Sequence, residues 1–600
     1  MSLSLDFTTL RRAYRGGTQT PLTVAAEVLA RIAAAGDDHV WITRVAPEAL
    51  LADARALAER SDPEALPLFG LPFAIKDNID VAGLPTGCGC PALDRAAAAS
   101  APVVERLRRA GALFVGKTNL DQFATGLVGT RSPYGVPRNP FDAAYIPGGS
   151  SSGSAVAVAA GLVSFALGTD TAGSGRVPAA FGNIVGLKPT HGLVSTRGVV
   201  PACRSLDCVS IFALTVEDAA AVLDIVRDGD EADPSWRRPP PGFAAMGRVP
   251  PRFAFGVLPT AERSHFASPE IAALYDAAIA RLAALGGTPV EIDYAPFLEA
   301  NRLLYHGAWL AERAAAIDAA TGGRRAVLHP VLAGILDGAR AITAADAFAD
   351  RQRLAGLRRA TEAVWRQVDL LALPTASTTY RIAEIAAEPV ALNETLGRYT
   401  NFCNLLDLAA LAVPAGLRRD GLPFGVTLLG PAFHDPLLAA VGAALHAAAG
   451  LPLGATGVRH PGPGEPTPGA TFPYLPIAVV GAHLSGEPLN RELVALGARL
   501  RRAGRTAPCY RLYALPDGRR PGLVRRAADG AAIEVEVWDV PSAAVGALLA
   551  GIAPPLGLGT VRLDDGSEVC GFLCEAHAVE GARDISAYGG WRAWRRAAGT

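Results

Sequence analysis

The chain has 600 residues, of which 50% are hydrophobic, and a formal net charge of −1, so two or more globular domains are expected. The balanced charge argues against nucleic acid as a partner, and the longest apolar stretch, residues 155–168, is too short to cross a membrane. The charged start of the chain lacks the apolar run of a secretory signal, and eight cysteines in so long a chain do not indicate a disulfide framework. A cytoplasmic protein is therefore expected.

Residues 1–453 alternate helical and strand-like segments. The pattern predicts an amphipathic helix over 20–35, buried strands over 71–77, 112–118 and 165–171, and a helix of small residues over 154–163. Short buried strands between helices predict an α/β domain whose site lies at the strand ends.

Residues 454–476 are rich in Pro and Gly and are interpreted as a linker. After it, 477–600 reads as a small, β-rich α+β domain. The predicted strands lie at 477–484, 509–516, 531–541 and within 559–575, with one helix over 541–552.

Residues 111–118, GALFVGKT, match the P-loop pattern G-x-x-x-x-G-K-[ST], which leaves a P-loop nucleotide-binding protein as an alternative of a different class. A P-loop needs a strand before its first glycine and a flexible loop after it. Here a helical segment, 103–110, comes first and 112–115 resemble a strand, so Lys117 is expected to be structural.

Residues 149–153, GSSSG, match the nucleophile elbow G-x-S-x-G, which sits on a turn after a buried strand. The preceding segment contains two prolines and has no strand period. This interpretation also lacks an evident histidine base.

A third pattern suggests a catalytic group formed by Lys76, Ser150 and Ser174. Only three of the 56 basic residues are lysines, and Lys76 ends an apolar strand, where burial lowers the pKa of an amine. A neutral amine can remove a proton from a serine, directly or through a second hydroxyl. The turn 171–174 offers consecutive backbone N–H groups for an oxyanion. The alternative is a solvated serine-rich loop beside a surface lysine.

Residues 147–190, together with GLPFAIKDNID at 70–80, resemble the amidase signature family of serine hydrolases. The resemblance implies Ser174 as nucleophile, Ser150 as a bridging serine in a cis peptide and Lys76 as base. It implies an α/β/α domain with a mixed central sheet, and an oxyanion hole from Thr171, Ala172 and Gly173. No metal or other cofactor is implied. The family's SSGG reads SSSG here at 150–153, and its GGS reads AGS at 172–174.

Residues 196–215, 303–317 and 479–493 resemble the allophanate hydrolase branch of this family. The implied substrate is allophanate, a urea with a carboxylate on one nitrogen, cleaved to ammonia and carbon dioxide through N-carboxycarbamate. Tyr305 and Arg313 match the carboxylate-binding pair, and their spacing places them on broadly the same side of one helix. Another amidase-signature enzyme, such as the glutaminase subunit of a tRNA amidotransferase, remains an alternative.

The second domain resembles the γ-glutamylcyclotransferase-like fold of allophanate hydrolases. His483 matches the position proposed there for processing N-carboxycarbamate, against the alternatives of an ordinary loop residue and a structural role for the domain. The resemblance implies a homodimer and a functional association with a urea carboxylase, with no membrane or nucleic-acid partner.

Overall fold

The computed structural model describes residues 3–93, 96–227, 229–240, 243–250, 252–462, 474–516, 518, 520–541 and 544–599. The chain divides into two compact units. The first contains Met1–Arg238 and Phe253–Gly469, and the second contains Pro239–Arg252 and Ala470–Thr600. The segment 239–252 therefore packs with the C-terminal part of the chain, although it lies inside the sequence of the predicted first domain.

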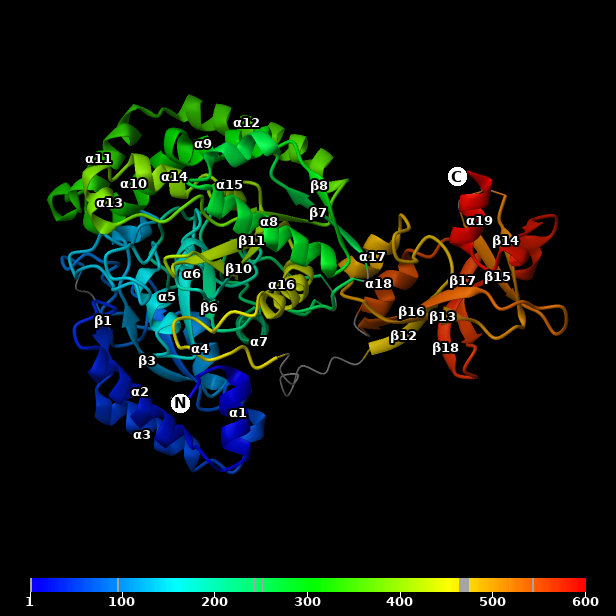
Figure 1. The fold of residues 1–600 in the computed structure, drawn as a ribbon, viewed down its shortest axis with the longest axis horizontal. Coiled ribbons are helices and arrows are strands. Elements are labelled where there is room, and N and C mark those ends of the chain that lie inside the picture. The colour runs from blue at the N-terminus through cyan, green and yellow to red at the C-terminus, as the bar shows by residue number, and fades with distance from the viewer. Residues whose placement is uncertain are drawn as a thin grey trace. The chain divides into compact units, whose positions relative to one another are not determined.

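An eleven-stranded mixed sheet runs through the first unit, in the order β1-β3-β2-β4-β6-β5-β10-β11-β9-β7-β8 (Figure 1). Its strands are β1 Trp41–Arg44, β2 Pro72–Lys76, β3 Leu113–Thr118, β4 Phe165–Asp170, β5 Val185–Lys188, β6 Cys208–Ala213, β7 Phe253–Val257, β8 Gly287–Glu291, β9 Leu370–Pro374, β10 Leu408–Leu417 and β11 Pro423–Pro431. Two groups of strands are parallel, β3-β2-β4 and β8-β7-β9, and the other pairs are antiparallel. The predicted α/β class with a mixed central sheet is confirmed.

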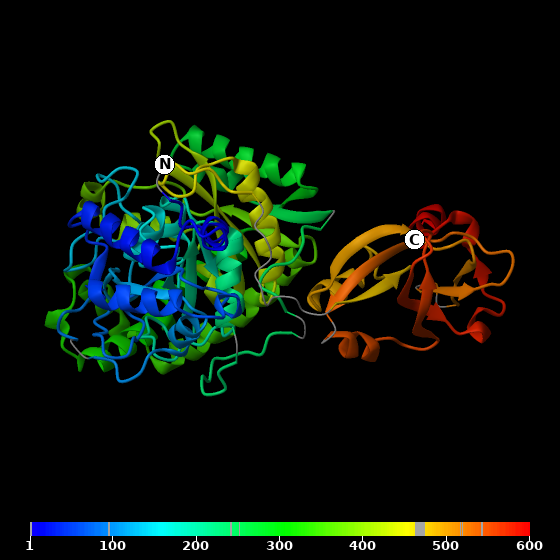
Figure 2. The ribbon, with the colours of Figure 1, turned by 90° about the horizontal axis from the view of Figure 1, so that it is seen from below.

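Helices surround this sheet, as the two views of Figures 1 and 2 show. They are α1 Phe7–Arg15, α2 Pro21–Ala35, α3 Pro47–Ala58, α4 Pro102–Arg109, α5 Ser152–Ala159, α6 Val177–Phe181, α7 Val216–Val226, α8 Pro269–Ala284, α9 Ala295–His306, α10 Ala308–Thr321, α11 Pro330–Asp337, α12 Ala344–Trp365, α13 Ile382–Ala387, α14 Ala391–Leu396, α15 Phe402–Leu405 and α16 Asp435–Ala449. Because helices cover both faces of the sheet, every residue of β2, β3 and β4 is buried, and each strand begins with an apolar run and ends in polar residues.

Local sequence explains where these elements begin. The predicted helix over 20–35 starts as α2 at Pro21, and the Thr20 hydroxyl accepts a hydrogen bond from the Thr23 backbone N–H. The predicted strands over 71–77, 112–118 and 165–171 form β2, β3 and β4.

The second unit has its own sheets and its own core. Its sheets run β13-β16-β12-β18-β17 and β15-β14-β19. Its elements are β12 Tyr474–Val479, α17 Asn490–Ala495, β13 Arg499–Arg505, β14 Tyr510–Ala514, β15 Pro521–Arg525, β16 Glu534–Pro541, α18 Val545–Ala550, β17 Leu556–Arg562, β18 Glu568–Cys574, β19 Arg583–Asp584 and α19 Trp591–Ala598. Residues 463–473 of the predicted linker lie outside the described residues, and its predicted last residues belong to β12.

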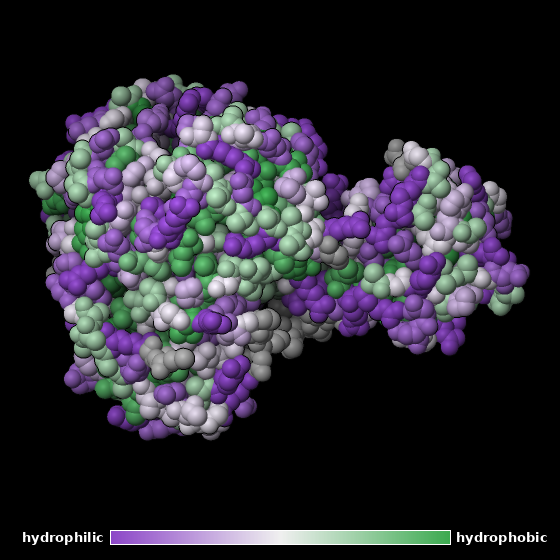
Figure 3. Space-filling model, viewed as in Figure 1, coloured by the Kyte–Doolittle hydropathy of each residue, from purple (hydrophilic) through white to green (hydrophobic). Residues whose placement is uncertain are grey.

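The face of the first unit in Figure 3 carries interspersed hydrophilic and hydrophobic residues. Large exposed hydrophobic side chains, such as Phe348 and Val390, occur singly. In the part of the chain that the structure describes, every helix falls short of the length and apolar character that a membrane span requires.

Candidate active site

The ends of β2 and β4 bring the predicted base close to the predicted nucleophile turn. The two strands are parallel, with Ile75 opposite Leu167, so their carboxyl ends meet at one edge of the sheet. Lys76 is the last residue of β2, and Thr169 and Asp170 end β4. The turn that carries Ser174 follows directly.

Lys76 and Ser150 are in contact. Lys76 Nζ donates hydrogen bonds to Ser150 Oγ at 2.7 Å and to Thr169 Oγ1 at 2.8 Å. The lysine is 0% exposed, and burial lowers its pKa to about 8, although the carboxylates of Asp121 and Asp207 raise it in part. A substantial fraction of the amine is therefore neutral just above neutral pH.

The loop before α5 presents Ser150. Its peptide bond with Gly149 is cis, and the Ser150 carbonyl accepts a hydrogen bond from the Asp121 backbone N–H at 3.0 Å. The next hydroxyl, Ser151 Oγ, donates to the Thr169 carbonyl at 3.1 Å. An irregular loop leads into α5 here, so the nucleophile-elbow interpretation, which needs a strand before the serine, is wrong.

Asp170 organises the turn around Ser174. Its buried carboxylate accepts hydrogen bonds from the backbone N–H groups of Gly173 and Gly175, at 2.9 and 3.0 Å. It also forms a bidentate ion pair with Arg176, whose Nε donates to Oδ2 at 2.9 Å and whose Nη2 donates to Oδ1 at 3.0 Å. This pair lowers the pKa of Asp170, although burial alone would raise it. Ser174 itself is 2% exposed.

The Gly173 N–H therefore points at Asp170, which differs from the expectation that it faces an oxyanion. Gly173 has φ +140°, and an added Cβ would lie 2.6 Å from Thr400 Oγ1, so the position requires glycine. The roles of the Thr171 and Ala172 N–H groups stay predictions.

Asp207 links this turn to the next segment of the site. Thr171 Oγ1 donates to Asp207 Oδ1 at 2.5 Å, and the Ala202 and Cys203 backbone N–H groups donate to the same carboxylate. Burial raises the pKa of Asp207 to about 6, against the effect of these hydrogen bonds and of nearby Arg313.

Thr169, Asp170 and Asp207 were not predicted from the sequence. Thr169 and Asp170 had a usable signal, because they end the predicted strand that leads into the nucleophile turn. Asp207 had no such signal, because it reaches Thr171 only through the fold.

The structure brings Tyr305 and Arg313 together, with the Arg313 guanidinium 5.5 Å from the centre of the Tyr305 ring. They do not share one helix, so that expectation is wrong. Gly307 adopts an extended conformation between α9 and α10, and Asp350 Oδ2 accepts a hydrogen bond from the Ala308 N–H at the start of α10. Arg313 is 1% exposed and donates from Nη1 to Thr125 Oγ1 at 2.7 Å. It is therefore not a solvated surface residue.

His483 lies in the second unit. Its ring stacks on Phe572 with centroids 5.1 Å apart, and its Nε2 lies 3.4 Å from Glu492 Oε2. Burial lowers the pKa of His483 against the effect of Glu492. The role of His483 stays a prediction.

The P-loop alternative is wrong. Gly116, Lys117 and Thr118 lie inside the buried strand β3 and not in a phosphate-binding loop. Lys117 Nζ lies 3.1 Å from Asp77 Oδ1 and donates to the Pro85 carbonyl and the Thr86 hydroxyl. Its interactions are structural, as expected from the preceding helix.

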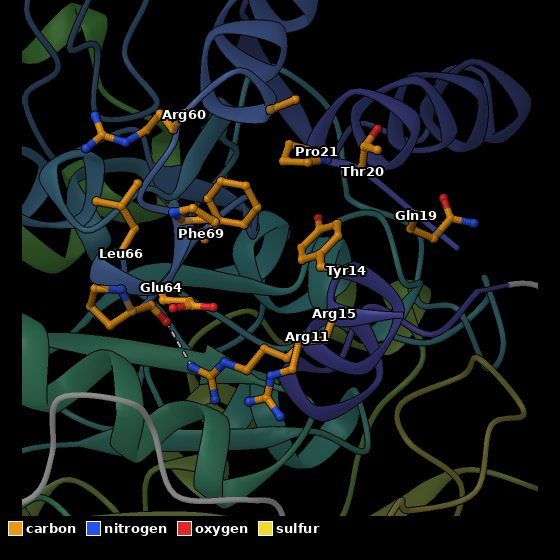
Figure 4. Close-up of a pocket in the computed structure, with 13 residues that line it drawn as sticks. Arg11, Tyr14, Arg15, Gln19, Thr20, Pro21, Arg60, Glu64, Leu66 and Phe69 are labelled. Carbon is orange, nitrogen blue, oxygen red and sulfur yellow. Dashed lines mark hydrogen bonds between the residues drawn. The ribbon is translucent and has the colours of Figure 1, made fainter. Parts of the chain in front are cut away.

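A cavity of about 400 Å³ lies among the N-terminal helices, away from this chemistry (Figure 4). Its lining includes Tyr14, Phe69, Arg11 and Arg60, and none of the predicted site residues. Arg11 donates to the Pro67 carbonyl at 2.9 Å and Arg60 pairs with Asp62, so both of these cations already have partners.

The fold and the site define an amide hydrolase, and the chain belongs to the amidase family, whose model, described as Amidase, matches residues 23–439. A second model, the allophanate hydrolase C-terminal domain, matches residues 475–596. Both resemblances predicted from the sequence are thereby confirmed.

The chain is also similar to individual proteins of this family. The chain is 40% identical over 587 residues to urea amidolyase of Saccharomyces cerevisiae, covering 93% of this chain but 31% of that protein, so it spans about a third of that relative's length. It is 36% identical over 466 residues to a glutamyl-tRNA(Gln) amidotransferase subunit of Symbiobacterium thermophilum, covering 71% of this chain and 93% of that one. The solved structure of Kluyveromyces lactis allophanate hydrolase superposes with a TM-score of 0.75 at 39% identity, covering 98% of each chain.

Proposed function

We propose that the first unit hydrolyses allophanate through an acyl-enzyme on Ser174. The observation that carries the proposal is the buried contact of 2.7 Å between Lys76 Nζ and Ser150 Oγ, beside the turn that holds Ser174. A lysine with a pKa of about 8 can serve as a general base at working pH, which an arginine cannot.

The proposed reaction begins when Ser174 Oγ attacks the carbonyl carbon of the terminal amide. The Ser174 proton passes to Ser150 Oγ, whose own proton passes to Lys76 Nζ. In its neutral form Lys76 donates to Thr169 Oγ1 and keeps its lone pair for Ser150, so Thr169 orients the base. The backbone N–H groups of Thr171 and Ala172 are the proposed oxyanion donors.

Collapse of the tetrahedral intermediate breaks the C–N bond, and the proton held by Lys76 returns through Ser150 to the leaving nitrogen as ammonia departs. Water then attacks the acyl-enzyme with the same relay as base. The products of this step are ammonia and N-carboxycarbamate, which decomposes to carbon dioxide and a second ammonia.

The substrate choice rests on Arg313. A buried guanidinium is costly to leave without an anion, and allophanate carries one carboxylate beside the amide to be cleaved. Tyr305, which packs against this guanidinium, is proposed to complete the carboxylate-binding pair.

A glutaminase of the tRNA amidotransferase type is less well supported. The amidotransferase relative matches 71% of this chain, whereas the urea amidolyase and allophanate hydrolase relatives match 93% and 98% of it, including the second unit. The proposal includes a cytoplasmic location, a homodimer and a functional association with a urea carboxylase, and it includes no nucleic-acid or membrane partner.

The test is ammonia release by the full chain from allophanate and from acetamide, with Ser174→Ala as the comparison. We expect turnover of allophanate in preference to acetamide, and a loss of about 10⁴-fold or more in Ser174→Ala with its melting temperature unchanged. Substantial turnover by Ser174→Ala would show that the nucleophile is misassigned. Equal turnover of both amides by the unaltered chain would reject allophanate as the substrate.

A further inference from the structure

Two buried guanidinium groups converge on Thr125, at one side of the site. Arg313, from α10, donates from Nη1 to Thr125 Oγ1 at 2.7 Å. Arg131, from the loop after the short 3₁₀ helix Gln122–Ala124, donates from Nη1 to the Thr125 carbonyl at 3.1 Å. Arg131 is 2% exposed and Arg313 is 1% exposed, so neither charge is solvated.

Their hydrogen bonding is incomplete. Nε of Arg131 and Nε of Arg313 are both buried and lack a hydrogen-bond partner among the described residues. Arg131 otherwise binds only backbone oxygens, with Nη2 donating to the Pro389 carbonyl at 2.6 Å. Burial lowers the pKa of Arg131, and the nearby charge of Arg313 lowers it further, while Asp121 raises it.

The nearest carboxylates, those of Asp121 and Asp207, accept hydrogen bonds from groups other than the two guanidinium groups. Asp121 accepts hydrogen bonds from the backbone N–H groups of Gly129 and Arg131, and its charge raises the pKa of Arg131 without a hydrogen bond to the guanidinium among the described contacts. Asp207 accepts from Thr171, Ala202 and Cys203. Each of these two buried guanidinium groups has an unpartnered Nε, and neither is hydrogen-bonded to a carboxylate among the described residues. This arrangement favours an additional anion supplied from outside the chain.

We propose that Arg131 is a positioning residue of the carboxylate subsite. Through Thr125 it fixes the guanidinium of Arg313, and its charge adds to the preference of the site for a small amide with one carboxylate. The inference rests on the proposed function, because it takes the substrate's carboxylate as the anion.

A purely structural role makes a different prediction. If Arg131 only ties the Thr125 and Pro389 carbonyls together, its loss lowers stability and weakens charged and neutral ligands alike. If it serves the carboxylate subsite, its loss weakens the charged ligand selectively.

The experiment uses the full chain with Ser174→Ala, which binds without turnover, and measures affinity by calorimetry. Malonamate, in which one methylene joins an amide to a carboxylate, is the charged probe, and malonamide is its neutral counterpart of nearly equal shape. The variants are Arg131→Gln, Arg131→Lys and Arg313→Ala. Arg281→Gln is the matched control, because Arg281 also donates to a backbone carbonyl, that of Ala415, at 2.8 Å.

We expect Arg131→Gln to weaken malonamate by about tenfold or more and malonamide by less than about twofold. Arg131→Lys should recover part of the preference, since it restores the charge without the planar fork. Arg281→Gln should change neither affinity. Unchanged malonamate binding in Arg131→Gln, or an equal loss for both probes, would overturn the inference.

Arg313→Ala separates this inference from the proposed function. If Arg313→Ala leaves the preference for malonamate intact, the carboxylate subsite itself is wrong and both proposals fall. If Arg313→Ala abolishes the preference and Arg131→Gln does not, only the role of Arg131 falls. Should Arg131→Gln not fold, Thr125→Val removes the hydroxyl that accepts from Arg313 and so breaks the link through which Arg131 would position that guanidinium. An unchanged preference for malonamate in that variant would equally overturn the inference.

Discussion

Lysine occurs at three positions in this chain, and at each of them the side chain is 0% exposed. Lys76 contacts two hydroxyls, Lys117 pairs with Asp77, and Lys188 Nζ donates to the Pro189 carbonyl at 2.9 Å. Each position holds a compact ammonium or amine against close polar partners, a geometry that a planar guanidinium does not reproduce. The rarity of lysine in an arginine-rich chain was therefore an informative signal.

Substituting Lys76 by arginine tests whether charge or basicity matters there. A guanidinium keeps its proton at every pH up to ~12, so the arginine in Lys76→Arg cannot accept a proton from Ser150. We expect a loss of about 10²- to 10⁴-fold in kcat with allophanate, similar to that of Lys76→Ala. Activity at a tenth of the unaltered level or more near neutral pH would show that Lys76 is not the base.

The pH profile of kcat/KM provides an independent test of the same amine. Burial lowers the pKa of Lys76 from 10.5 to about 8, and only the neutral form accepts a proton. The rate should therefore rise with pH, about tenfold per unit below pH 8, and level off above it. A rate that stays constant from about pH 6 to 9 would contradict this assignment. Buffers of matched ionic strength and a melting curve at each pH serve as controls.

At the scale of elements, the turn between β4 and α6 depends on one buried ion pair. Asp170 and Arg176 are both 0% exposed, and Asp170 also receives the Gly173 and Gly175 N–H groups. Asp170→Asn leaves the guanidinium buried without its carboxylate, so we expect the free energy of unfolding to fall by about 3–5 kcal/mol, with loss of activity. Urea unfolding monitored by circular dichroism measures the change.

The matched control for that change is Asp276→Asn. Asp276 also pairs with an arginine, Arg263, but its side chain is 57% exposed. Its loss should cost about 1 kcal/mol or less. If the two substitutions cost the same, the turn does not depend on the buried pair.

Elements near the site were predictable where their signal is local. The apolar runs that became β2, β3 and β4 are short, continuous and bounded by polar residues. In the second unit the predicted strands correspond to β12, β14, β16, β17 and β18, whereas β13 and β15 were not predicted. The break between α9 and α10 was not predictable, because the helical pattern continues through Gly307. It depends on Asp350, 42 residues away in the sequence, which accepts the first N–H of α10.

The same distinction applies to site residues. Lys76 is the last residue of β2, and Ser174 lies in the turn that follows β4. Both strands were predicted from the sequence, so the predicted positions of these residues agree with the chemistry proposed for them. Arg131 and Asp207 also contact residues distant in the sequence, Pro389 and Thr171, and these contacts could not be predicted from the local sequence.

At the scale of the whole molecule, the proposed hydrolytic residues and the core of the second unit belong to different units. Lys76, Ser150, Ser174 and Arg313 lie in the first unit, whereas the second unit has a separate core that includes Tyr510, Trp538 and Trp591. The described residues of this second core all belong to the second unit, so a substitution in it should leave the proposed chemistry at Ser174 in place.

His483→Ala in the full chain tests how the reaction is divided between the units. The His483 ring packs on Phe572 and beside Glu492, so removing it alters only the second unit. In the proposed reaction, cleavage of the terminal amide releases the first ammonia at Ser174, and the second ammonia appears only when N-carboxycarbamate decomposes. We expect the initial rate of ammonia release to stay within about twofold of the unaltered chain, because the relay residues are untouched. If His483 processes the intermediate, the time course will show a lag before the second ammonia, and N-carboxycarbamate will accumulate in carbon NMR spectra. A loss of the first ammonia comparable to that of Ser174→Ala, in a folded variant, would contradict the assignment of amide cleavage to the first unit alone.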